Sequence, residues 1–484
     1  MGNTCGKVEK EVPKNQGDNF ALNKRDLVRV KTTNIRNDYS IGDKIGNEKF
    51  AALHKCKSKQ TGQRLLVKIF SVTAIEPKAL ESFIQEAELL READHPNIIK
   101  VIDIYKDETN AYIVTEYCKG GELLERITEL GSLSENKVAS YMKQIISAVV
   151  YLHSKRIIHR DLRLENVMFL NKDKDSCLKL VEFGSCKHFE KNVRVLERVG
   201  SPYFMSPEVI LGNFDSKCDV WSLGVMIYVL LSGSTPFVGS TETEIMQSVL
   251  TSELLFEGKK WKKISNEAKN LIRSLLNRNS KERPNAKHVL NDPWIKQRAE
   301  NKVADNEIIS STLSNLNQFD NQSKLQRATL AFIVSQIMSS DDVGALQNVF
   351  KEIDSNGDGL LSKKEIRKAL ESNTGYSDND IEILISKVDL DQNGLVNYSE
   401  FLAATVDWNK EMSRDRLVQA FKALDADHSG KISKEELMAA FGGSHTSSKI
   451  FKEMINEADI DGDGEIDLEE FCTYMENFKE RVKS

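Results

Sequence analysis

Three side chains suited to metal and proton chemistry lie close together between Ile158 and Gly184. Asp161 follows a His-Arg pair, Asn166 comes five residues later, and Glu182 stands directly before a Phe-Gly pair. Phosphoryl transfer requires a carboxylate that orients the attacking hydroxyl and oxygen ligands for the metal ion that bridges the phosphates. The segment therefore predicts such a site, with Asp161 as the catalytic carboxylate and Asn166 and Glu182 as Mg²⁺ ligands.

Four acidic loops of twelve residues form a second set of candidate ligands, and they start 35, 36 and 34 residues apart. Oxygen-bearing side chains at positions 1, 3, 5 and 9, a glycine at 6 and a glutamate at 12 make the EF-hand calcium site, in which position 7 contributes its backbone carbonyl. The predicted Ca²⁺ ligands are Asp354, Asn356, Asp358, Leu360, Ser362 and Glu365; Asp389, Asp391, Asn393, Leu395, Asn397 and Glu400; Asp425, Asp427, Ser429, Lys431, Ser433 and Glu436; Asp459, Asp461, Asp463, Glu465, Asp467 and Glu470. The third loop has the weakest donor set, so we expect it to bind calcium least tightly.

Length and charge divide the chain. At 484 residues it is too long for one hydrophobic core, which predicts a catalytic unit and at least one smaller domain. From residue 341 onward, 31 acidic side chains stand against 17 basic ones, whereas the first 340 residues hold 50 basic and 42 acidic side chains. Because the excess acids lie in the repeats, the asymmetry favours cation binding, and no feature predicts a nucleic-acid partner.

Cysteines and apolar runs bear on the compartment. The seven cysteines are scattered and never spaced as CxxC, which fits a reducing cytosol better than a disulfide framework or a zinc site. The longest apolar run, Val220 to Leu231, has the length of a buried helix rather than of a membrane span. These features predict a cytoplasmic protein.

The segment from Ile158 to Gly184 resembles the catalytic and metal loops of the protein kinase family, in which Asp stands at the position of Glu182. The resemblance implies that Lys68, in Leu-Leu-Val-Lys-Ile, pairs with the α- and β-phosphates of ATP. It also implies that Glu86, on a helix predicted over 77–93, forms an ion pair with Lys68. Arg163 replaces a common lysine but keeps a cation that can reach the γ-phosphate.

The same resemblance implies an ATP site between two lobes, with Thr115 at the gatekeeper position. The residues it assigns to that site are Gly46, Lys68, Thr115, Glu116, Cys118, Glu122 and Met168. Glu122 and Glu165 match family positions that receive basic residues upstream of the target serine, which predicts protein substrates with basic motifs.

Several residues depart from the family pattern at the nucleotide. Glu48 and Ala51 occupy glycine positions of the phosphate-covering loop, and Leu66 replaces a small alanine. Glu182 would move a metal ligand by about 1.5 Å, and Mg²⁺ demands near-ideal octahedral geometry. Because Lys68, Glu86, Asp161 and Asn166 are retained, we expect a kinase that is slow or prefers Mn²⁺. The alternative is a calcium-responsive pseudokinase acting as a switchable binding or scaffold module.

The order of the parts resembles that of the calcium-dependent protein kinases of plants and protists. We expect an α+β, bilobal kinase fold followed by an all-α domain of four EF-hands. The predicted parts are a flexible start (1–38), a kinase domain (39–295), an autoinhibitory junction helix (296–340) and a calmodulin-like domain (341–484). The resemblance implies that calcium opens the EF-hand pairs, whose grooves then capture the junction and free the active site.

Two other features bear on regulation. Apolar residues at helical spacing, among them Leu325, Ala328 and Phe332, predict an amphipathic junction helix, although a plain linker helix has the same pattern. At the start, Gly2 and Cys5 match sites of myristoylation and palmitoylation, which would attach the protein to a membrane surface. Gly6 stands where that pattern prefers Ser or Thr, so an ordinary N-terminus is the alternative.

Overall fold

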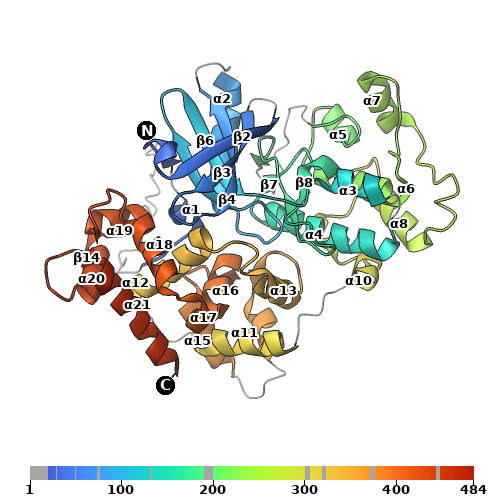
Figure 1. Ribbon diagram of the computed structural model, residues 1–484. Helices are drawn as coiled ribbons and strands as arrows, with labels where there is room; N and C mark the ends of the chain where they lie inside the picture. Colours follow the sequence, from blue (N-terminus) through green and yellow to red (C-terminus); the bar gives the residue numbers. More distant parts are fainter. Residues whose placement is uncertain are drawn as a thin grey trace, which may run out of the picture.

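The computed structural model describes residues 20–28, 30–48, 51–72, 77–130, 133–189, 200–299, 306–318, 323–370, 377–442 and 447–483. A strand-rich lobe lies at the top of Figure 1, a helical lobe lies to its right, and the helices that carry the acidic repeats lie below and to the left. This is the α+β architecture that the sequence predicts.

The strand-rich lobe is built on one six-stranded sheet in the order β1-β5-β6-β4-β3-β2. Its strands are β1 (Val30–Lys31), β2 (Tyr39–Asn47), β3 (Ala51–Ser58), β4 (Arg64–Ser71), β5 (Val101–Lys106) and β6 (Asn110–Glu116), joined by the short helices α1 (Lys24–Leu27) and η1 (Ile35–Asn37) and by α2 (Pro77–Glu92). Neighbouring strands are antiparallel except β1 and β5. Side chains along β4 alternate between two hydrophobic clusters, because strand side chains point to opposite faces of the sheet. Val67 belongs to a small cluster within the strand-rich lobe, whereas Phe70 packs on Phe83 of α2 in the larger cluster that continues into the helical lobe.

The helical lobe carries the catalytic segment. Its elements are α3 (Leu123–Leu130), α4 (Glu135–Ser154), β7 (Ile157–Ile158), η2 (Leu164–Asn166), β8 (Val167–Phe169), β9 (Leu178–Leu180), β10 (Lys187–His188), α5 (Pro207–Ile210), α6 (Lys217–Ser232), α7 (Glu242–Thr251), α8 (Asn266–Leu275), α9 (Ala286–Leu290) and α10 (Pro293–Arg298). Helix α6 contains the longest apolar run and lies in the core of this lobe, as its length predicts. Among the described helices, none combines the length and hydropathy needed to cross a bilayer.

The acidic repeats form two pairs of helix-loop-helix units. Their elements are α13 (Gly344–Ile353), β11 (Leu360–Leu361), α14 (Lys363–Leu370), α15 (Asp378–Val388), β12 (Val396–Asn397), α16 (Tyr398–Thr405), α17 (Trp408–Glu411), α18 (Arg414–Leu424), β13 (Lys431–Ile432), α19 (Lys434–Phe441), α20 (Ser448–Ala458), β14 (Ile466–Asp467) and α21 (Leu468–Lys483). Two short antiparallel ladders, β11 with β12 and β13 with β14, join the loops in pairs.

The junction contains two helices where the sequence predicts one. They are α11 (Asn306–Gln318) and α12 (Lys324–Phe332), and α12 continues into the π-helical turn η3 (Ile333–Ile337). A capping box between Ser323 and Gln326 starts α12. The apolar faces of these helices, including Leu325 and Phe332, belong to the hydrophobic core of the EF-hand region. The junction is therefore held by the EF-hands in this structure.

The expectation of a flexible start needs correction for residues 20–38. Phe20, Leu22 and Leu27 are buried in the core of the EF-hand region, whereas Val28 is buried in the core of the kinase lobes. Figure 1 shows α1 between the sheet and the helices α18 and α19. This order is hard to predict because the segment is too short for a periodic pattern and depends on contacts with two distant surfaces.

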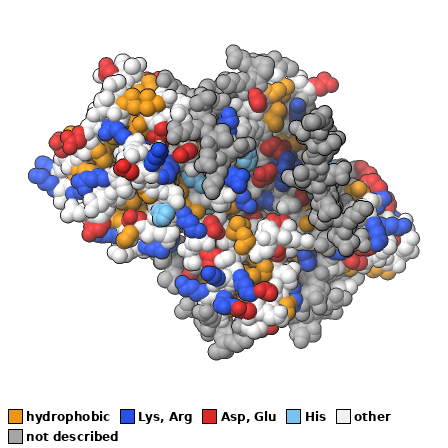
Figure 2. All heavy atoms as spheres, turned by 180° about the vertical axis from the view of Figure 1, so that it is seen from behind, with side chains coloured by type: hydrophobic (Ala, Val, Ile, Leu, Met, Phe, Trp, Pro, Cys, Tyr) orange, Lys and Arg blue, Asp and Glu red, His pale blue; other side chains and the backbone are white. Residues whose placement is uncertain are grey.

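The surface carries charges of both signs. On the face shown in Figure 2, the described Lys and Arg side chains are interspersed with Asp and Glu side chains over both the kinase lobes and the EF-hand region.

Candidate active site and calcium loops

A buried carboxylate, which was not assigned a role from the sequence, holds the catalytic loop in place. Asp219, at the start of α6, accepts hydrogen bonds from the backbone N–H groups of His159 and Arg160, each at 2.9 Å. His153 Nε2 lies 2.8 Å from the same carboxylate. Burial alone would raise the pKa of Asp219, but the His153 contact lowers it below its ordinary value, so Asp219 holds the loop as an anion.

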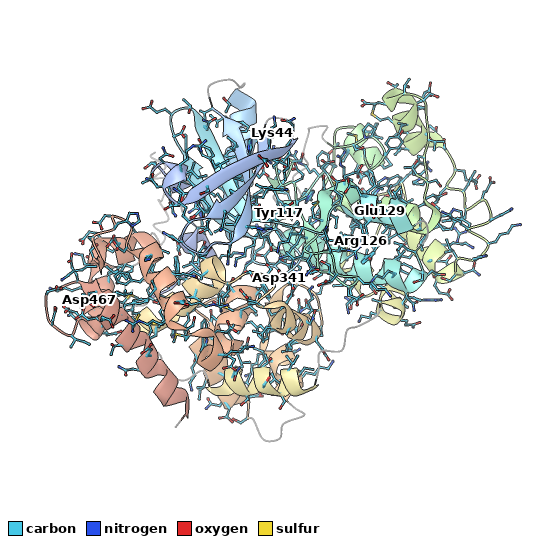
Figure 3. All side chains as sticks on the ribbon, viewed as in Figure 1. Lys44, Tyr117, Arg126, Glu129, Asp341 and Asp467 are labelled. Carbon is cyan, nitrogen blue, oxygen red and sulfur yellow. The ribbon has the colours of Figure 1, made fainter. Side chains whose placement is uncertain are left out.

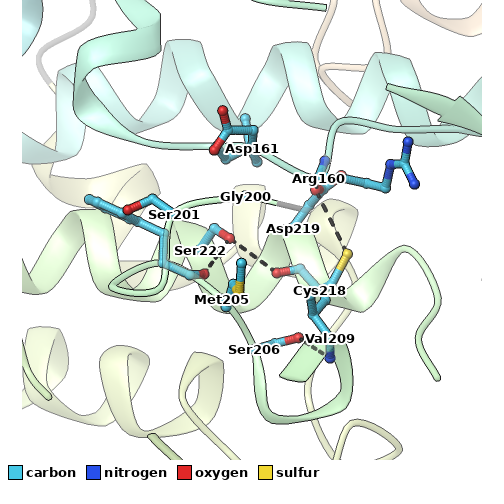
Figure 4. A pocket seen from close by; sticks show the side chains of 12 residues that line it. Arg160, Asp161, Gly200, Ser201, Met205, Ser206, Val209, Cys218, Asp219 and Ser222 are labelled. Carbon is cyan, nitrogen blue, oxygen red and sulfur yellow. Dashed lines mark hydrogen bonds between the residues drawn. The ribbon is translucent and has the colours of Figure 1, made fainter. Parts of the chain in front are cut away.

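Asp161 and Asn166 meet as predicted. The Asn166 amide donates to the backbone oxygen of Asp161 at 2.8 Å and to its Oδ2 at 3.2 Å. Asp161 Oδ1 is buried and has no hydrogen-bond partner among the described residues. Asp161 is among the residues that line the pocket of Figure 4, with Gly200 and Ser201 from the end of the substrate loop, and Oδ1 is its oxygen without a hydrogen bond among the described residues. This oxygen is available to accept a proton from a substrate hydroxyl.

Lys68 sits among three carboxylates, one more than the kinase resemblance implies. Its Nζ lies 2.9 Å from both carboxylate oxygens of Glu86, the residue expected to pair with it. Glu48, from the end of β2, contacts the same ammonium, and Glu182 Oε1 lies 4.0 Å from it. Burial would lower the pKa of Lys68, but Glu86, Glu182 and Glu48 raise it, so the ammonium keeps its charge.

Glu182 has a strained backbone and a raised pKa. Its φ of +64° lies in the left-handed region, which non-glycine residues rarely adopt. Burial, followed by a hydrogen bond with Glu48, raises the pKa of Glu182 to about 9. The Asn166 amide oxygen and the Glu182 carboxylate are donor types that Mg²⁺ and Mn²⁺ accept, so these side chains fit a divalent cation once Glu182 has lost its proton.

The carboxylate of Glu116, a predicted ATP-site residue, is fully engaged by other residues of the protein. Its Oε1 accepts bonds from Lys179 Nζ and from the backbone N–H of Lys100, both at 2.8 Å, and its Oε2 accepts the hydroxyl of Ser340 at 2.5 Å. Only its backbone remains for a nucleotide. Lys179 was missed, although a lysine between two leucines of a strand is a signal of a buried ion pair.

The other predicted ATP-site residues come from neighbouring elements. Thr115 on β6 pairs with Leu66 on β4, and Glu122 forms a bridge to Met168 on β8. The remaining members are Gly46 on β2 and the buried Cys118 after β6. Arg163 Nε lies 3.9 Å from Glu165 Oε2, so this arginine is held beside an acid that the sequence assigns to substrate binding.

Each calcium loop gathers its acidic side chains. Three carboxylates approach within 4.8 Å of one another in the loops beginning at Asp389, Asp425 and Asp459. In the first loop, Asp354 accepts the N–H groups of Gly357 at 2.7 Å and Gly359 at 2.9 Å, which curls the loop around the carboxylate. Such sets of oxygen donors fit Ca²⁺.

The two pairs of loops differ in environment. Burial raises the pKa of Asp354 to about 7 and that of Glu400 to about 8, because charged oxygens are costly in the packed first pair. In the second pair, hydrogen bonds from Ser429 lower the pKa of Asp427, and a hydrogen bond from Lys431 lowers that of Asp463.

The first loop also touches the kinase lobes. Ser147 Oγ on α4 donates to the Gly357 backbone oxygen at 3.2 Å. A Cβ at Gly357 would lie 2.1 Å from Leu290 Cδ2, and one at Gly359 would lie 2.7 Å from His95 Cδ2. The loop backbone therefore packs directly against α4, α9 and the segment after α2.

The acylation sites predicted at Gly2 and Cys5 lie outside the described residues.

Known proteins match the whole arrangement. Residues 39–295 match the protein kinase domain, and residues 345–406 and 414–476 match the EF-hand domain pair. The chain is 35% identical over 480 residues to calcium-dependent protein kinase 4 of Plasmodium berghei, covering 96% of this chain and 91% of that protein. It is also 35% identical to calcium-dependent protein kinase 5 of Plasmodium falciparum (94% and 81% covered) and to calcium-dependent protein kinase 7 of Oryza sativa (92% and 82% covered).

Proposed function

Since the chain belongs to the calcium-dependent protein kinases, we propose that Asp161, Lys68 and Asn166 perform its calcium-regulated transfer of the ATP γ-phosphate to protein serine or threonine. The observation that carries this proposal is the Lys68–Glu86 pair at 2.9 Å, together with an Asp161 oxygen that has no hydrogen-bond partner among the described residues. Family membership by itself gives the reaction class. The residue roles follow from this geometry.

Each residue has a separate task. Asp161 orients the attacking hydroxyl and accepts its proton, because its Oδ1 is buried and unbonded among the described side chains. Lys68 places a fixed positive charge toward the α- and β-phosphates, and Glu86 holds that ammonium in position. Arg163 adds a cation near the γ-phosphate and the incoming substrate. Glu122 and Glu165 give this entrance a negative charge, which favours substrates with basic residues.

Asn166 and Glu182 would hold a divalent cation. When bound, Mg²⁺ or Mn²⁺ neutralises charge on the phosphates. The raised pKa of Glu182 means that a proton competes with the cation for this carboxylate, and its longer side chain suits the looser coordination geometry of Mn²⁺ better than that of Mg²⁺. We therefore expect higher activity with Mn²⁺ than with Mg²⁺.

The EF-hand region supplies the regulation. The burial of α11, α12 and η3 with the EF-hands supports the assignment of this arrangement to a released kinase. Lys100 Nζ donates to the backbone oxygens of Val334 and Met338, both at 3.0 Å, and fixes the end of the junction behind the sheet. In Figure 3, Asp341 lies just below the hinge residue Tyr117, and its carboxylate is 3.7 Å from Lys119 Nζ. These contacts support calcium-driven removal of the junction from the substrate cleft.

One assay tests the catalytic proposal. Purified full-length protein is offered a basic serine peptide with Mg²⁺ or Mn²⁺, with and without calcium, beside Asp161→Asn. We expect calcium-dependent phosphorylation that falls by at least about 100-fold in the variant, because a general base contributes that much. No transfer under any condition, or equal transfer by Asp161→Asn, would reject it and leave a calcium-responsive binding module.

Membrane attachment through Gly2 and Cys5 is a separate proposal that rests on the sequence alone. Intact mass measurement of protein from eukaryotic cells tests it: an unmodified mass would reject it.

A further inference from the structure

We propose that Phe20–Val28 is a strap that couples the second calcium loop to helix α2 and so positions Glu86 against Lys68. Phe20 and Lys24 are, in this view, positioning residues for the reaction. This inference rests on the proposed regulation by calcium, and it concerns residues that precede the matched kinase domain.

One end of the strap is built into the EF-hand region. The Leu22 N–H donates to the backbone oxygen of Leu390 at 2.9 Å, and the Gln392 amide donates to the Phe20 oxygen at 3.1 Å. Leu390 and Gln392 are the second and fourth residues of the second calcium loop. The Phe20 ring meets Phe451 of α20 edge to face, with 6.5 Å between ring centroids. The strap thus contacts both EF-hand pairs.

The contact with the second loop reaches a calcium ligand. Leu390 accepts the strap bond through its carbonyl and donates its own N–H to Glu400 Oε1 at 2.7 Å. Glu400 occupies position 12, which binds calcium with both oxygens in an EF-hand. When the Glu400 carboxylate adjusts to calcium, the Leu390 peptide and the strap bonded to it are the first neighbours affected.

The other end of the strap holds the C-terminal turn of α2. Lys24 Nζ donates to the Ala93 backbone oxygen at 2.5 Å, placing a cation at the helix C-terminus, where it is stabilising. Arg25 forms ion pairs with Glu88 at 2.7 Å and Glu92 at 3.2 Å. In return, Arg91 donates to the Val28 oxygen at 2.5 Å. A helix moves as a rigid unit over such short distances, so fixing this turn also fixes Glu86.

A second contact, separate from the strap, joins the second calcium loop directly to the end of α2. Asp94, just after α2, accepts the Ser399 N–H at 3.0 Å and the Ser399 hydroxyl at 2.8 Å, and Lys24 lies 3.4 Å from the same carboxylate. Ser399 is the eleventh residue of the second calcium loop and lies at the start of α16. Lys24 therefore joins the strap, the end of α2 and the second calcium loop at one point.

The test compares calcium effects on α2 in the full chain. Backbone hydrogen exchange over residues 80–92 is measured without calcium and at calcium concentrations that calorimetry shows to be saturating. The variants are Phe20→Ala at the EF-hand end and Lys24→Met at the kinase end. The matched control is Lys31→Met, because Lys31 lies on β1, just after the strap, and pairs with Asp38 and Asp103 of the sheet lobe instead of with α2 or the EF-hands.

We expect calcium to slow exchange over α2 by at least about fivefold in the wild type and in Lys31→Met, and by less than about twofold in the two strap variants. A strap that only stabilised the fold would change exchange equally with and without calcium. If Phe20→Ala does not fold, the comparison is made with Lys24→Met alone, because that substitution removes no large buried ring. An absent calcium effect in the wild type, or a full effect in the strap variants, would overturn the proposal. If the wild type shows this exchange pattern but does not phosphorylate the peptide, the catalytic assignment is rejected and the strap proposal stands.

Discussion

Glu48 occupies the place that a nucleotide phosphate needs, so its removal should strengthen nucleotide binding. The Glu48 carboxylate contacts Lys68 Nζ, the ammonium expected to pair with the α- and β-phosphates. A bound nucleotide must displace this carboxylate. In Glu48→Gln, the side chain keeps its size but loses its charge, so the phosphates meet less competition for Lys68.

The size of the effect follows from the burial of the pair. The side chains of Lys68 and Glu48 are 14% and 20% exposed, so water screens their attraction only in part. A hydrogen bond to a charged group contributes about 1.5–3 kcal/mol. Because 1.4 kcal/mol corresponds to a factor of ten, Glu48→Gln should bind nucleotide about 10- to 100-fold more tightly.

Calorimetry with a non-hydrolysable ATP analogue, Mg²⁺ and saturating calcium measures this directly. Asp43→Asn is the matched control, because Asp43 is exposed on the same strand β2 and its removal changes the net charge equally. Equal affinities of the two variants would mean that the effect is long-range electrostatics. Weaker binding by Glu48→Gln would mean that Glu48 helps to hold the cation, and it would refute the competition argument.

Three further outcomes are expected. Glu182→Asp should raise turnover with Mg²⁺ more than with Mn²⁺ in steady-state assays, and equal gains would contradict the account of metal geometry. Gly357→Ala should weaken docking by about 1–3 kcal/mol, seen as a higher calcium concentration for half-maximal activity. Gly462→Ala is its control, with the same loop position and a left-handed φ but no atom of the described residues within 4 Å of the new Cβ; equal shifts would disprove docking through the loop. The pKa values of Asp354 and Glu400 are raised to about 7 and 8, and both side chains must lose a proton to bind calcium. Calcium affinity should therefore fall as the pH drops from 8 to 6, by up to about tenfold per pH unit for each proton released. Calorimetry in buffers of different ionisation heat would detect those protons, and no proton release would contradict the assignment.

Local residue order was enough to predict the reaction class and the calcium sites. An EF-hand loop contains nearly all of its ligands within twelve consecutive residues, so spacing alone defines the site. Asp161 and Asn166 are likewise close in sequence, and the structure brings their side chains into hydrogen-bond contact. Pairing of Lys68 with Glu86 was inferred from resemblance to a family, and the 2.9 Å contact in the structure agrees with it.

Contacts between distant segments could not be predicted in the same way. Glu48 was expected to weaken phosphate binding by size and charge, but only the folded sheet places its carboxylate on Lys68 and beside Glu182. The hinge carboxylate of Glu116 is engaged by Lys179 and Ser340, which are 63 and 224 residues away along the chain. No local periodicity encodes such pairs.

The order of residues by itself determined that this chain transfers phosphate under calcium control, because those chemistries use short, self-contained sets of ligands. Only the tertiary structure decided how the two parts are joined. Phe20–Val28 has no pattern of its own, yet it passes from the EF-hand core at Leu27 to the kinase core at Val28. Its order comes from burial against helix α2, 63 to 69 residues later in the chain, and against the EF-hand region, more than 360 residues later, and burial depends on the whole fold.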